Sequence, residues 1–404
     1  MQQRRNKTSI FRENIVSDIS AKRDEWLSAI ETRVEMVLSN MVMVSDVPAK
    51  TFKEKERAKL VLERFIESGL PDPFTDSLNN VIGIRYSEES QRKILLFAHM
   101  DHQFAENVEQ DITITEDRAY GTGIANDTAG LAVLMTIPDI IDALDLELKS
   151  DIILLASTRS HGRGDFAGIR YFLDNNEVPI DSVLHISGVT LGRFDYSSLS
   201  RVRCDITCRA SLTQNSKTWG KFGYSSAIMV VNEIMSQLYS ISLPRQPKTV
   251  LNIGMISGGE SYSSVSTEAS LNLEVLSEDD NITEDLIDRI NDLCVDIGAK
   301  HGVETELEFF GRHHSAGLNS SHPLVKTATT IVNYLGYNPL MEYANSEIAV
   351  PLALNIPTLT LGITTGNLSN TPKGYVDIEP ISTGILQVIM LLFAIDKGYC
   401  DEKP

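Results

Sequence analysis

The chain has 404 residues and a formal net charge of −19, with 42% hydrophobic and 23% charged residues. These proportions are typical of a globular protein, and the length predicts two domains. The acidic balance argues against nucleic-acid and anionic-membrane partners, because both need a basic surface. The four cysteines include no CxxC pair, so we expect neither a disulfide framework nor a zinc knuckle.

The N-terminal stretch MQQRRNKTSIF is basic, but no apolar stretch of a secretory signal follows it. No apolar run in the sequence approaches the length of a membrane span. We therefore expect a cytoplasmic protein without membrane partners.

The pattern of the first 100 residues predicts helices followed by strands. Apolar residues near a spacing of 3.6 predict helices within residues 11–44 and 51–69. Strands are predicted at 80–87 and 93–100. We treat residues 1–44 as a leading helical segment.

The apolar run from Ile94 to Ala98 predicts a buried strand that ends at His99 and Asp101. These two side chains point to one face, because they lie two residues apart on an extended chain. A Gly-rich loop, GTGIANDTAG, then brings Asp127 to the start of an apolar helix. Histidine and aspartates at strand ends suit metal or acid/base chemistry. The alternative is ordinary capped or solvated polar residues, with Asp127 as an N-cap.

Strands and helices then alternate, which predicts an α/β domain with a mostly parallel sheet flanked by helices on both faces. The elements that carry this pattern are strands at 151–158, 182–188 and 357–362 and helices at 166–176, 322–335 and 379–397. We assign residues 45–199 and 312–404 to this domain.

Between these two parts, residues 200–311 have the order strand, helix, strand, strand, helix, strand. This order predicts a small antiparallel α+β domain of ferredoxin-like type inserted into the first. The predicted elements are strands at 201–212, 248–257, 266–277 and 303–310 and helices at 224–239 and 281–301.

From about Val44 onward the chain resembles the co-catalytic zinc exopeptidases and deacylases, which include glutamate carboxypeptidase, tripeptide aminopeptidase, succinyl-diaminopimelate desuccinylase and aminoacylase. The segments that carry the resemblance are FAHMDHQF, GTGIANDTAG, GKFGYSSAI, LNIGMISGG, NSEIAVPLALNIPTLTLG and GYVDIEP. The resemblance implies a zinc exopeptidase-like fold with an inserted lid or dimerisation domain. It also implies that His99 binds one metal, that Asp127 bridges two, and that Asp101 orients His99.

The sequence departs from the family where a pair of glutamates normally follows the strand at 151–158. The first acts as general base and the second binds metal, but Ser160 and His161 stand there. A serine hydroxyl cannot replace a carboxylate as proton acceptor near neutral pH. The resemblance therefore implies that the general base is missing at Ser160.

Further family ligands are also replaced. Ser187 stands where an acidic ligand is expected, and His185, two residues earlier, either reaches inward or is an ordinary histidine in a sheet. Asn370 stands where the last ligand histidine is expected, and no histidine follows His322. In the inserted domain, the family's histidine, asparagine and arginine appear as Lys217, Ser263 and Leu276.

The remaining donors limit the metal capacity. Zinc catalysis needs about three protein ligands and one open position. His99, Asp127 and His161 could form one such site. We expect one weakly held zinc or other divalent ion, or none.

Two hypotheses follow from the sequence. In the first, the protein has lost the family's catalytic activity and binds a peptide, an acyl-amino acid or a protein partner. In the second, it is an active single-metal peptidase or N-acyl-amino-acid hydrolase with a rebuilt site.

We also expect a homodimer formed through residues 200–311. The predicted helix at 224–239 carries more apolar surface than a small sandwich needs on one face. The alternative is that this face packs on its own sheet.

Overall fold

The computed structural model describes residues 16–104, 111–176, 178–211, 226–367 and 373–402. The chain divides into two units, one formed by Met1–Ser197 and Gly317–Pro404 and the other by Ser198–Ala316. These boundaries lie within five residues of the insertion limits expected from the sequence. Short strands β9 (Ser197–Ser198) and β14 (Ala316–Gly317) lie where the chain passes from one unit to the other.

The first unit is built on a sheet of seven strands in the order β1-β2-β6-β3-β7-β16-β8. The four central strands β6, β3, β7 and β16 run parallel, and β2 and β8 add antiparallel neighbours. The strands are β1 (Phe74–Thr75), β2 (Val81–Arg85), β3 (Lys93–His99), β6 (Asp151–Ser157), β7 (Ser182–Val189), β8 (Phe194–Asp195) and β16 (Thr358–Thr364). The expected mostly parallel sheet is confirmed.

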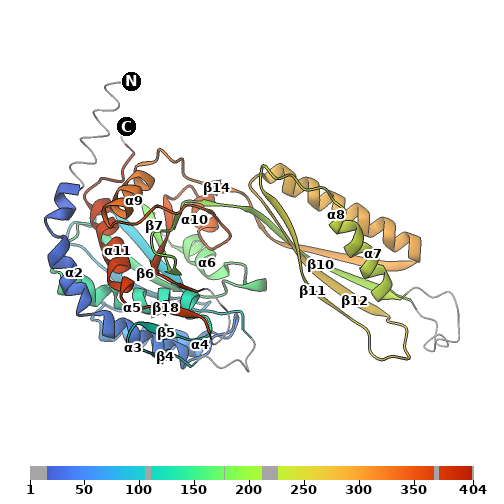
Figure 1. Cartoon of the computed structure of the whole chain (residues 1–404), viewed down its shortest axis with the longest axis horizontal. Coiled ribbons are helices and arrows are strands. Elements are labelled where there is room, and N and C mark those ends of the chain that lie inside the picture. The colour runs from blue at the N-terminus through green and yellow to red at the C-terminus, as the bar shows by residue number, and fades with distance from the viewer. Residues whose placement is uncertain (1–15, 105–110, 177, 212–225, 368–372, 403–404) are drawn as a thin grey trace, which may run out of the picture. The chain divides into compact units, whose positions relative to one another are not determined.

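Helices cover this sheet on both sides (Figure 1). Almost every side chain of α5 and α11 is buried, which accounts for their nearly continuous apolar sequences. The helices of this unit are α2 (Arg23–Glu31), α3 (Val34–Ser45), α4 (Lys55–Glu67), α5 (Ala129–Ala143), α6 (Ala167–Asn175), α9 (Pro323–Tyr334), α10 (Ala349–Ala353) and α11 (Pro380–Asp396). A smaller sheet has the order β17-β18-β5-β4, made of β4 (Thr113–Ile114), β5 (Arg118–Tyr120), β17 (Gly366–Asn367) and β18 (Tyr375–Asp377), and β15 covers Tyr343–Ala344.

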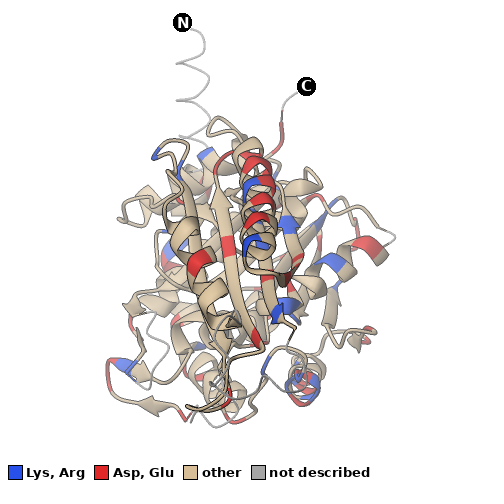
Figure 2. Ribbon diagram, turned by 90° about the vertical axis from the view of Figure 1, so that its right-hand side faces the viewer, with Lys and Arg blue, Asp and Glu red and all other residues tan. Residues whose placement is uncertain are grey.

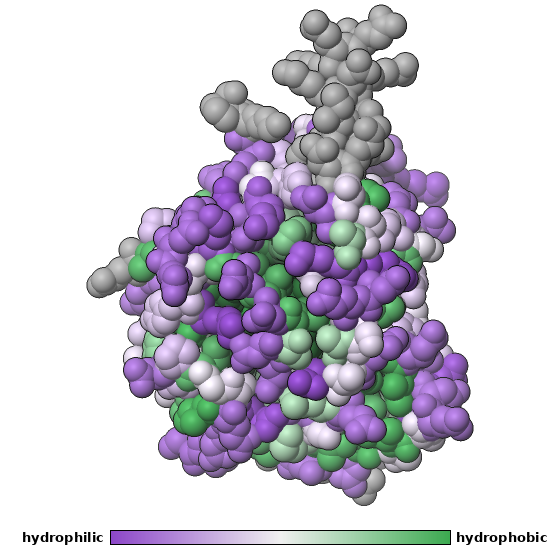
Figure 3. Space-filling model, turned by 90° about the vertical axis from the view of Figure 1, so that its left-hand side faces the viewer, coloured by the Kyte–Doolittle hydropathy of each residue, from purple (hydrophilic) through white to green (hydrophobic). Residues whose placement is uncertain are grey.

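The leading segment belongs to this unit rather than standing apart from it. Its described residues include helices α2 and α3 and a helical stretch at 16–20, and the fully buried Trp26 packs edge-on against Phe393 of α11. The surface on this side is largely hydrophilic, with apolar residues showing mainly in its middle (Figure 3).

One helical stretch in the described part of the chain, Ile124–Ala143, is 20 residues long and apolar enough to cross a membrane, which corrects the sequence-based expectation. It forms because a π-helical turn, η1 (Ile124–Thr128), runs directly into α5. Of its apolar window, 88% is buried inside the protein. The stretch is therefore accounted for as a core helix.

The second unit has the predicted order of elements. Its antiparallel sheet has the order β11-β12-β10-β13, and helices α7 and α8 lie together on one face (Figure 1). The elements are β10 (Ser200–Ala210), α7 (Ala227–Tyr239), β11 (Thr249–Gly258), β12 (Glu268–Ser277), α8 (Asp280–His301) and β13 (Val303–His313). The expected inserted α+β domain is confirmed in fold. In the ribbon of Figure 2, the positions of Lys and Arg are interspersed with those of Asp and Glu among the described residues.

Candidate functional site

The candidate site lies where neighbouring parallel strands end. His99 is the last residue of β3, and the loop carrying Ser160 and His161 follows β6. His185 comes from β7 on the other side of β3. Because β3 is parallel to both neighbours, these ends meet at one edge of the sheet, where α/β folds place their ligands.

Asp101 organises this edge through its carboxylate. The side chain is fully buried and accepts hydrogen bonds from the Thr51 hydroxyl at 2.7 Å and from the backbone amides of Ser160 at 2.9 Å and His161 at 3.2 Å. The buried Glu54 carboxylate accepts the preceding amide, that of Arg159, at 2.9 Å. Two carboxylates thus hold three consecutive amides and fix the loop that presents Ser160 and His161.

The predicted role of Asp101 as orienter of His99 has a different geometry in the structure. His99 Nδ1 lies 3.0 Å from the backbone carbonyl oxygen of Asp101, whereas the carboxylate of Asp101 lies 3.9 Å away. A carbonyl oxygen can only accept, so Nδ1 carries the proton and Nε2 carries the lone pair. The backbone therefore sets the tautomer of His99, while the carboxylate mainly holds the neighbouring loop.

Three imidazoles gather at this point. The ring centres of His99 and His161 are 5.0 Å apart, edge to face, and those of His99 and His185 are 6.5 Å apart. His185 stacks on Phe97 with ring centres 4.6 Å apart, and its Nδ1 lies 3.2 Å from Thr360 Oγ1. Of the two readings of His185, the structure supports the inward-reaching one, although one nitrogen is also satisfied within the sheet.

Glu347 joins these residues from the turn before α10, and no role was predicted for it. Its side chain is only 4% exposed. Burial favours the neutral acid, but the imidazoles of His99 and His185 and the Ser160 hydroxyl outweigh it and lower the pKa of Glu347 to about 2. A lone carboxylate directly before the largely apolar segment IAVPLALNIP was the available signal in the sequence.

Burial has the opposite consequence for His185. Its buried position, helped by His99 and opposed by the Glu347 carboxylate, lowers the pKa of His185 to about 4. Burial thus disfavours the imidazolium form of His185, whereas the Glu347 carboxylate favours it.

Several buried polar atoms of the described residues lack a hydrogen-bond partner here. They include Ser160 Oγ, His185 Nε2 and Glu347 Oε1. Ser160 Oγ lies close to the Glu347 carboxylate without meeting hydrogen-bond geometry. Buried polar groups are normally paired, and leaving one unpaired costs about 1–3 kcal/mol. This concentration of unpaired atoms marks a place suited to a polar ligand.

The described donors do not fit the two-metal centre that the resemblance implies. The resemblance predicts carboxylates at the positions of Ser160 and Ser187, both of which carry hydroxyls. Among the residues that the structure describes, no three His, Cys, Asp or Glu side chains could hold one ion. The side chain of Asp127, in η1, lies outside the described part. The predicted single site of His99, Asp127 and His161 stays a prediction.

Other predicted positions are placed as follows. Lys217 and Asn370 lie outside the described residues. Ser263 is exposed, and Leu276 is half-buried on β12 of the second unit. The structure supplies no contact that gives either of these two a role in binding.

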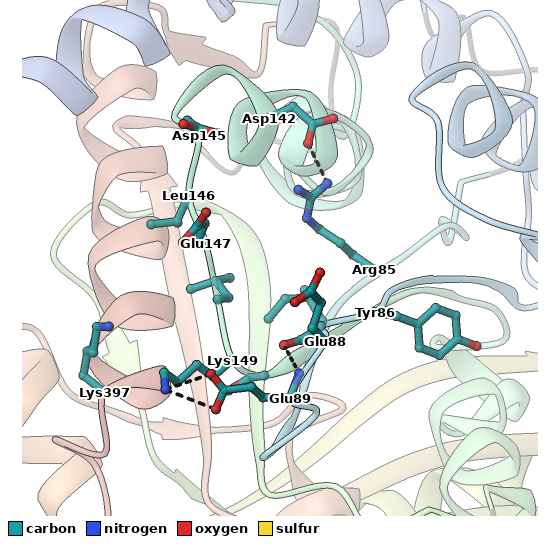
Figure 4. A pocket seen from close by; sticks show the side chains of 14 residues that line it. Arg85, Tyr86, Glu88, Glu89, Asp142, Asp145, Leu146, Glu147, Lys149 and Lys397 are labelled. Atoms are coloured by element: carbon teal, nitrogen blue, oxygen red, sulfur yellow. Dashed lines mark hydrogen bonds and ion pairs between the residues drawn. The ribbon is translucent and has the colours of Figure 1, made fainter.

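A large surface cavity of about 470 Å³ lies elsewhere in the first unit (Figure 4). It includes Ser150 and Ile152 at the start of β6, whereas the histidines lie beyond the end of that strand. Seven residues of strand place the two about 20 Å apart. Arg85 pairs with Asp142 at 2.6 Å and Lys149 with Glu89 at 2.9 Å on its wall. The cavity is thus separate from the histidines.

Solved structures that resemble this chain include peptidases and amidases. A tripeptidase from Staphylococcus aureus aligns with a TM-score of 0.74 at 18% identity, covering 90% of this chain and 99% of the tripeptidase. The dipeptidase Dug1p from Saccharomyces cerevisiae aligns with a TM-score of 0.75 at 13% identity, covering 92% of this chain and 98% of the dipeptidase. A dinuclear metal-binding M20 peptidase from Bacillus subtilis aligns with a TM-score of 0.64 at 15% identity, covering 91% of this chain and 99% of that peptidase. At these identities the likeness shows the fold.

No protein with a curated description matches the chain. The family model "Peptidase family M20/M25/M40" matches residues 95–392, which is well over half of the sequence and includes the edge that carries the histidines. The resemblance inferred from the motifs is thereby confirmed. The chain belongs to peptidase family M20/M25/M40.

Proposed function

We propose that this protein uses the M20 fold to bind a peptide, an acyl-amino acid or a protein partner without hydrolysing it by the family's mechanism. One observation carries the proposal. The position expected for the general base is held by Ser160, a buried hydroxyl whose backbone amide is fixed to Asp101.

Neither nearby carboxylate is a good substitute for the missing base. Asp101 already accepts three hydrogen bonds from the loop and Thr51. The pKa of Glu347 lies near 2, so its carboxylate has little affinity for a proton at neutral pH. An efficient general base has a pKa close to the working pH. This supports binding rather than turnover.

A single-metal hydrolase is the second candidate, and the spacing of two imidazoles favours it. Two imidazole ligands of one zinc ion, each bonded at about 2 Å, have ring centres about 5 Å apart. The rings of His99 and His161 are 5.0 Å apart. With the lone pair of His99 on Nε2, these two side chains are suited to one ion, and Asp127 would have to complete the site.

The decisive experiment is metal content per chain, measured without a histidine tag after offering zinc, manganese and cobalt separately. We expect no stoichiometric metal in wild type or in Asp127→Ala, and no turnover across dipeptides and N-acyl amino acids. One metal per chain that is lost in Asp127→Ala, with turnover abolished in His99→Ala, would replace our proposal with the hydrolase.

We further propose that the protein is a homodimer through the second unit. Val231, Ile234 and Leu238 of α7 are buried on their own sheet, as the alternative reading required, but Met229 on the same helix is 62% exposed. The edge strand β11 adds further exposed apolar side chains, Val250, Met255 and Ile256.

We expect a dimer in sedimentation equilibrium that dissociates at least tenfold more readily in Met229→Glu. The matched control is Met341→Glu in the first unit, where the methionine is 48% exposed. A monomer in wild type contradicts the proposal.

A further inference from the structure

Two segments of the first unit pack against each other beside the edge that carries the histidines. One is the turn at 50–54, and the other is the loop at 159–166 that follows β6. A Cβ atom placed on Gly164 would lie 2.8 Å from Thr51 Cγ2 and 2.4 Å from the Arg159 carbonyl oxygen. Because only glycine leaves room for this approach, the turn and the loop are in direct contact.

One buried carboxylate holds a residue from each segment. Glu54 Oε1 accepts the backbone amide of Phe52 at 3.0 Å and that of Arg159 at 2.9 Å. Both residues have a left-handed backbone, with φ of 74° for Phe52 and 56° for Arg159. This conformation is unfavourable for residues other than glycine and persists only where the surroundings enforce it. The fold thus fixes where the two side chains leave the backbone.

The two side chains also contact each other. The guanidinium carbon of Arg159 lies over the Phe52 ring, 5.5 Å from its centre, which is within the range of a cation–π contact. Phe52 is nevertheless 56% exposed. No described residue gives the Arg159 side chain an ion pair or a hydrogen bond, and its buried Nε lacks a partner. A guanidinium offers five N–H donors in a planar fork that matches a carboxylate, so Arg159 is suited to an anionic group.

The exposed charges around this pair are positive. The exposed charged residues of the two segments are Lys50, Lys53 and Arg163. The acidic residues of the same segments are already engaged, because Glu54 is buried beneath the two amides and Asp165 pairs with Arg170 at 3.5 Å. In a chain with a net charge of −19, such a group of basic side chains favours an anionic partner.

We propose that this surface binds an acidic peptide segment of a protein partner. Arg159, stacked on Phe52, anchors one carboxylate side chain, and the three exposed cations attract its acidic neighbours. Arginine and aromatic residues are enriched in protein interfaces. A nucleic acid is a poorer match, because the net charge of −19 repels an extended polyanion more than a short segment. The inference rests on the proposed binding function and selects the ligand within it.

The test uses two peptides blocked at both ends, one of alternating glutamate and glycine and one with glutamine in place of each glutamate. Both are also made with a free carboxyl end. Dissociation constants are measured calorimetrically at low and at high salt. At low salt we expect wild type to bind the blocked glutamate peptide at least about tenfold more tightly than the glutamine peptide, and salt should reduce this ratio by screening the exposed charges.

Arg159→Gln should weaken binding of the glutamate peptide about tenfold and leave the glutamine peptide unchanged, as expected for losing a charged hydrogen bond. Arg159→Lys should recover only part of this loss, since lysine keeps the charge but lacks the planar fork. The control Arg85→Gln removes the same charge from an arginine of the same unit that pairs with Asp142, and it should keep the preference. Phe52→Ala is a second, independent variant and should weaken the glutamate peptide about two- to fivefold.

The outcomes separate this inference from the proposed function. Equal affinity of wild type for the two blocked peptides, or a glutamate preference that survives in Arg159→Gln, overturns the acidic-segment surface while peptide binding stands. Binding of neither peptide also overturns it and leaves the proposed function to another ligand. A glutamate peptide that binds only with a free carboxyl end assigns Arg159 to a terminal carboxylate and overturns the inference. Hydrolysis of a peptide overturns the binding-only function, and the ratio of KM values for the glutamate and glutamine peptides then decides the inference.

Discussion

The two ends of strand β6 present opposite kinds of polar surface. At its start, the cavity of about 470 Å³ is walled by charged side chains that pair with one another, such as Arg85 with Asp142. At its end, Ser160 is buried without a partner for its hydroxyl. The volume of the cavity would place a binding site at the start of β6. The buried polar atoms without hydrogen-bond partners place it at the end of the strand instead. In this protein the unmatched atoms are the better guide to a site, because solvent does not satisfy them.

The largest difference between the two ends of β6 is expected in the loss of stability when an aspartate is removed from each. Asp101→Ala removes the acceptor of three hydrogen bonds inside the protein, so we expect the free energy of unfolding to fall by about 3–5 kcal/mol. Asp142→Ala removes an ion pair whose carboxylate is 54% exposed, and we expect a loss of at most about 1 kcal/mol. Urea unfolding of both variants measures the difference. Equal losses would remove the distinction between the two ends.

The second prediction concerns the loss of stability at acidic pH that His185 causes. The pKa of His185 is about 4 in the folded protein against an ordinary 6.5. The unfolded chain therefore binds a proton first as the pH falls, and stability is lost between pH 6.5 and 4. A difference of about 2.5 units corresponds to about 3 kcal/mol.

His185→Phe should remove this part of the acid sensitivity, since a phenyl ring can also stack on Phe97. Urea unfolding at pH 7.5, 6, 5 and 4 compares the variant with wild type, and His322→Phe is the control, a histidine whose pKa burial lowers elsewhere in the unit. Identical pH profiles for wild type and His185→Phe would show that this ring is not held neutral by burial.

The smallest expected difference is in the stability change when each of the two serines on either side of β6 is replaced by alanine. Ser150 donates a hydrogen bond to Asp396 Oδ1 at 2.8 Å, so Ser150→Ala should cost about 1 kcal/mol. The Ser160 hydroxyl has no partner, so Ser160→Ala should leave stability unchanged or raise it by up to about 1 kcal/mol. Thermal unfolding gives both values. A comparable loss in the two variants would mean that the Ser160 hydroxyl is satisfied in solution.

The sequence predicted the architecture well, because the information that specifies it is local. The apolar run ending at His99 and the alternating pattern of β10 each follow from the period of a strand. The division of residues 11–44 into α2 and α3 was not predicted, since both helices continue one apolar pattern.

The site was predicted less completely, because its parts meet through the fold. Glu347 lies 248 positions after His99 in the chain, and no spacing rule connects them. The position of His185 depended on whether its side chain faced the β3 end, which only the pairing of β7 with β3 decides. The hydrogen bond that sets the tautomer of His99 comes from a backbone carbonyl and leaves no mark in residue identity.

The closeness of Ser160 and Glu347 determines what a carboxylate placed at position 160 would do. Replacing Ser160 with glutamate would put a second carboxylate beside the buried one. Two like charges at such a distance cannot both ionise easily, so they would share a proton and one would titrate far above its usual range. Ser160→Glu alone would therefore give a pair of acids that share a proton. A carboxylate at position 160 that ionises on its own would require Glu347 to be neutralised as well, for example by Glu347→Gln.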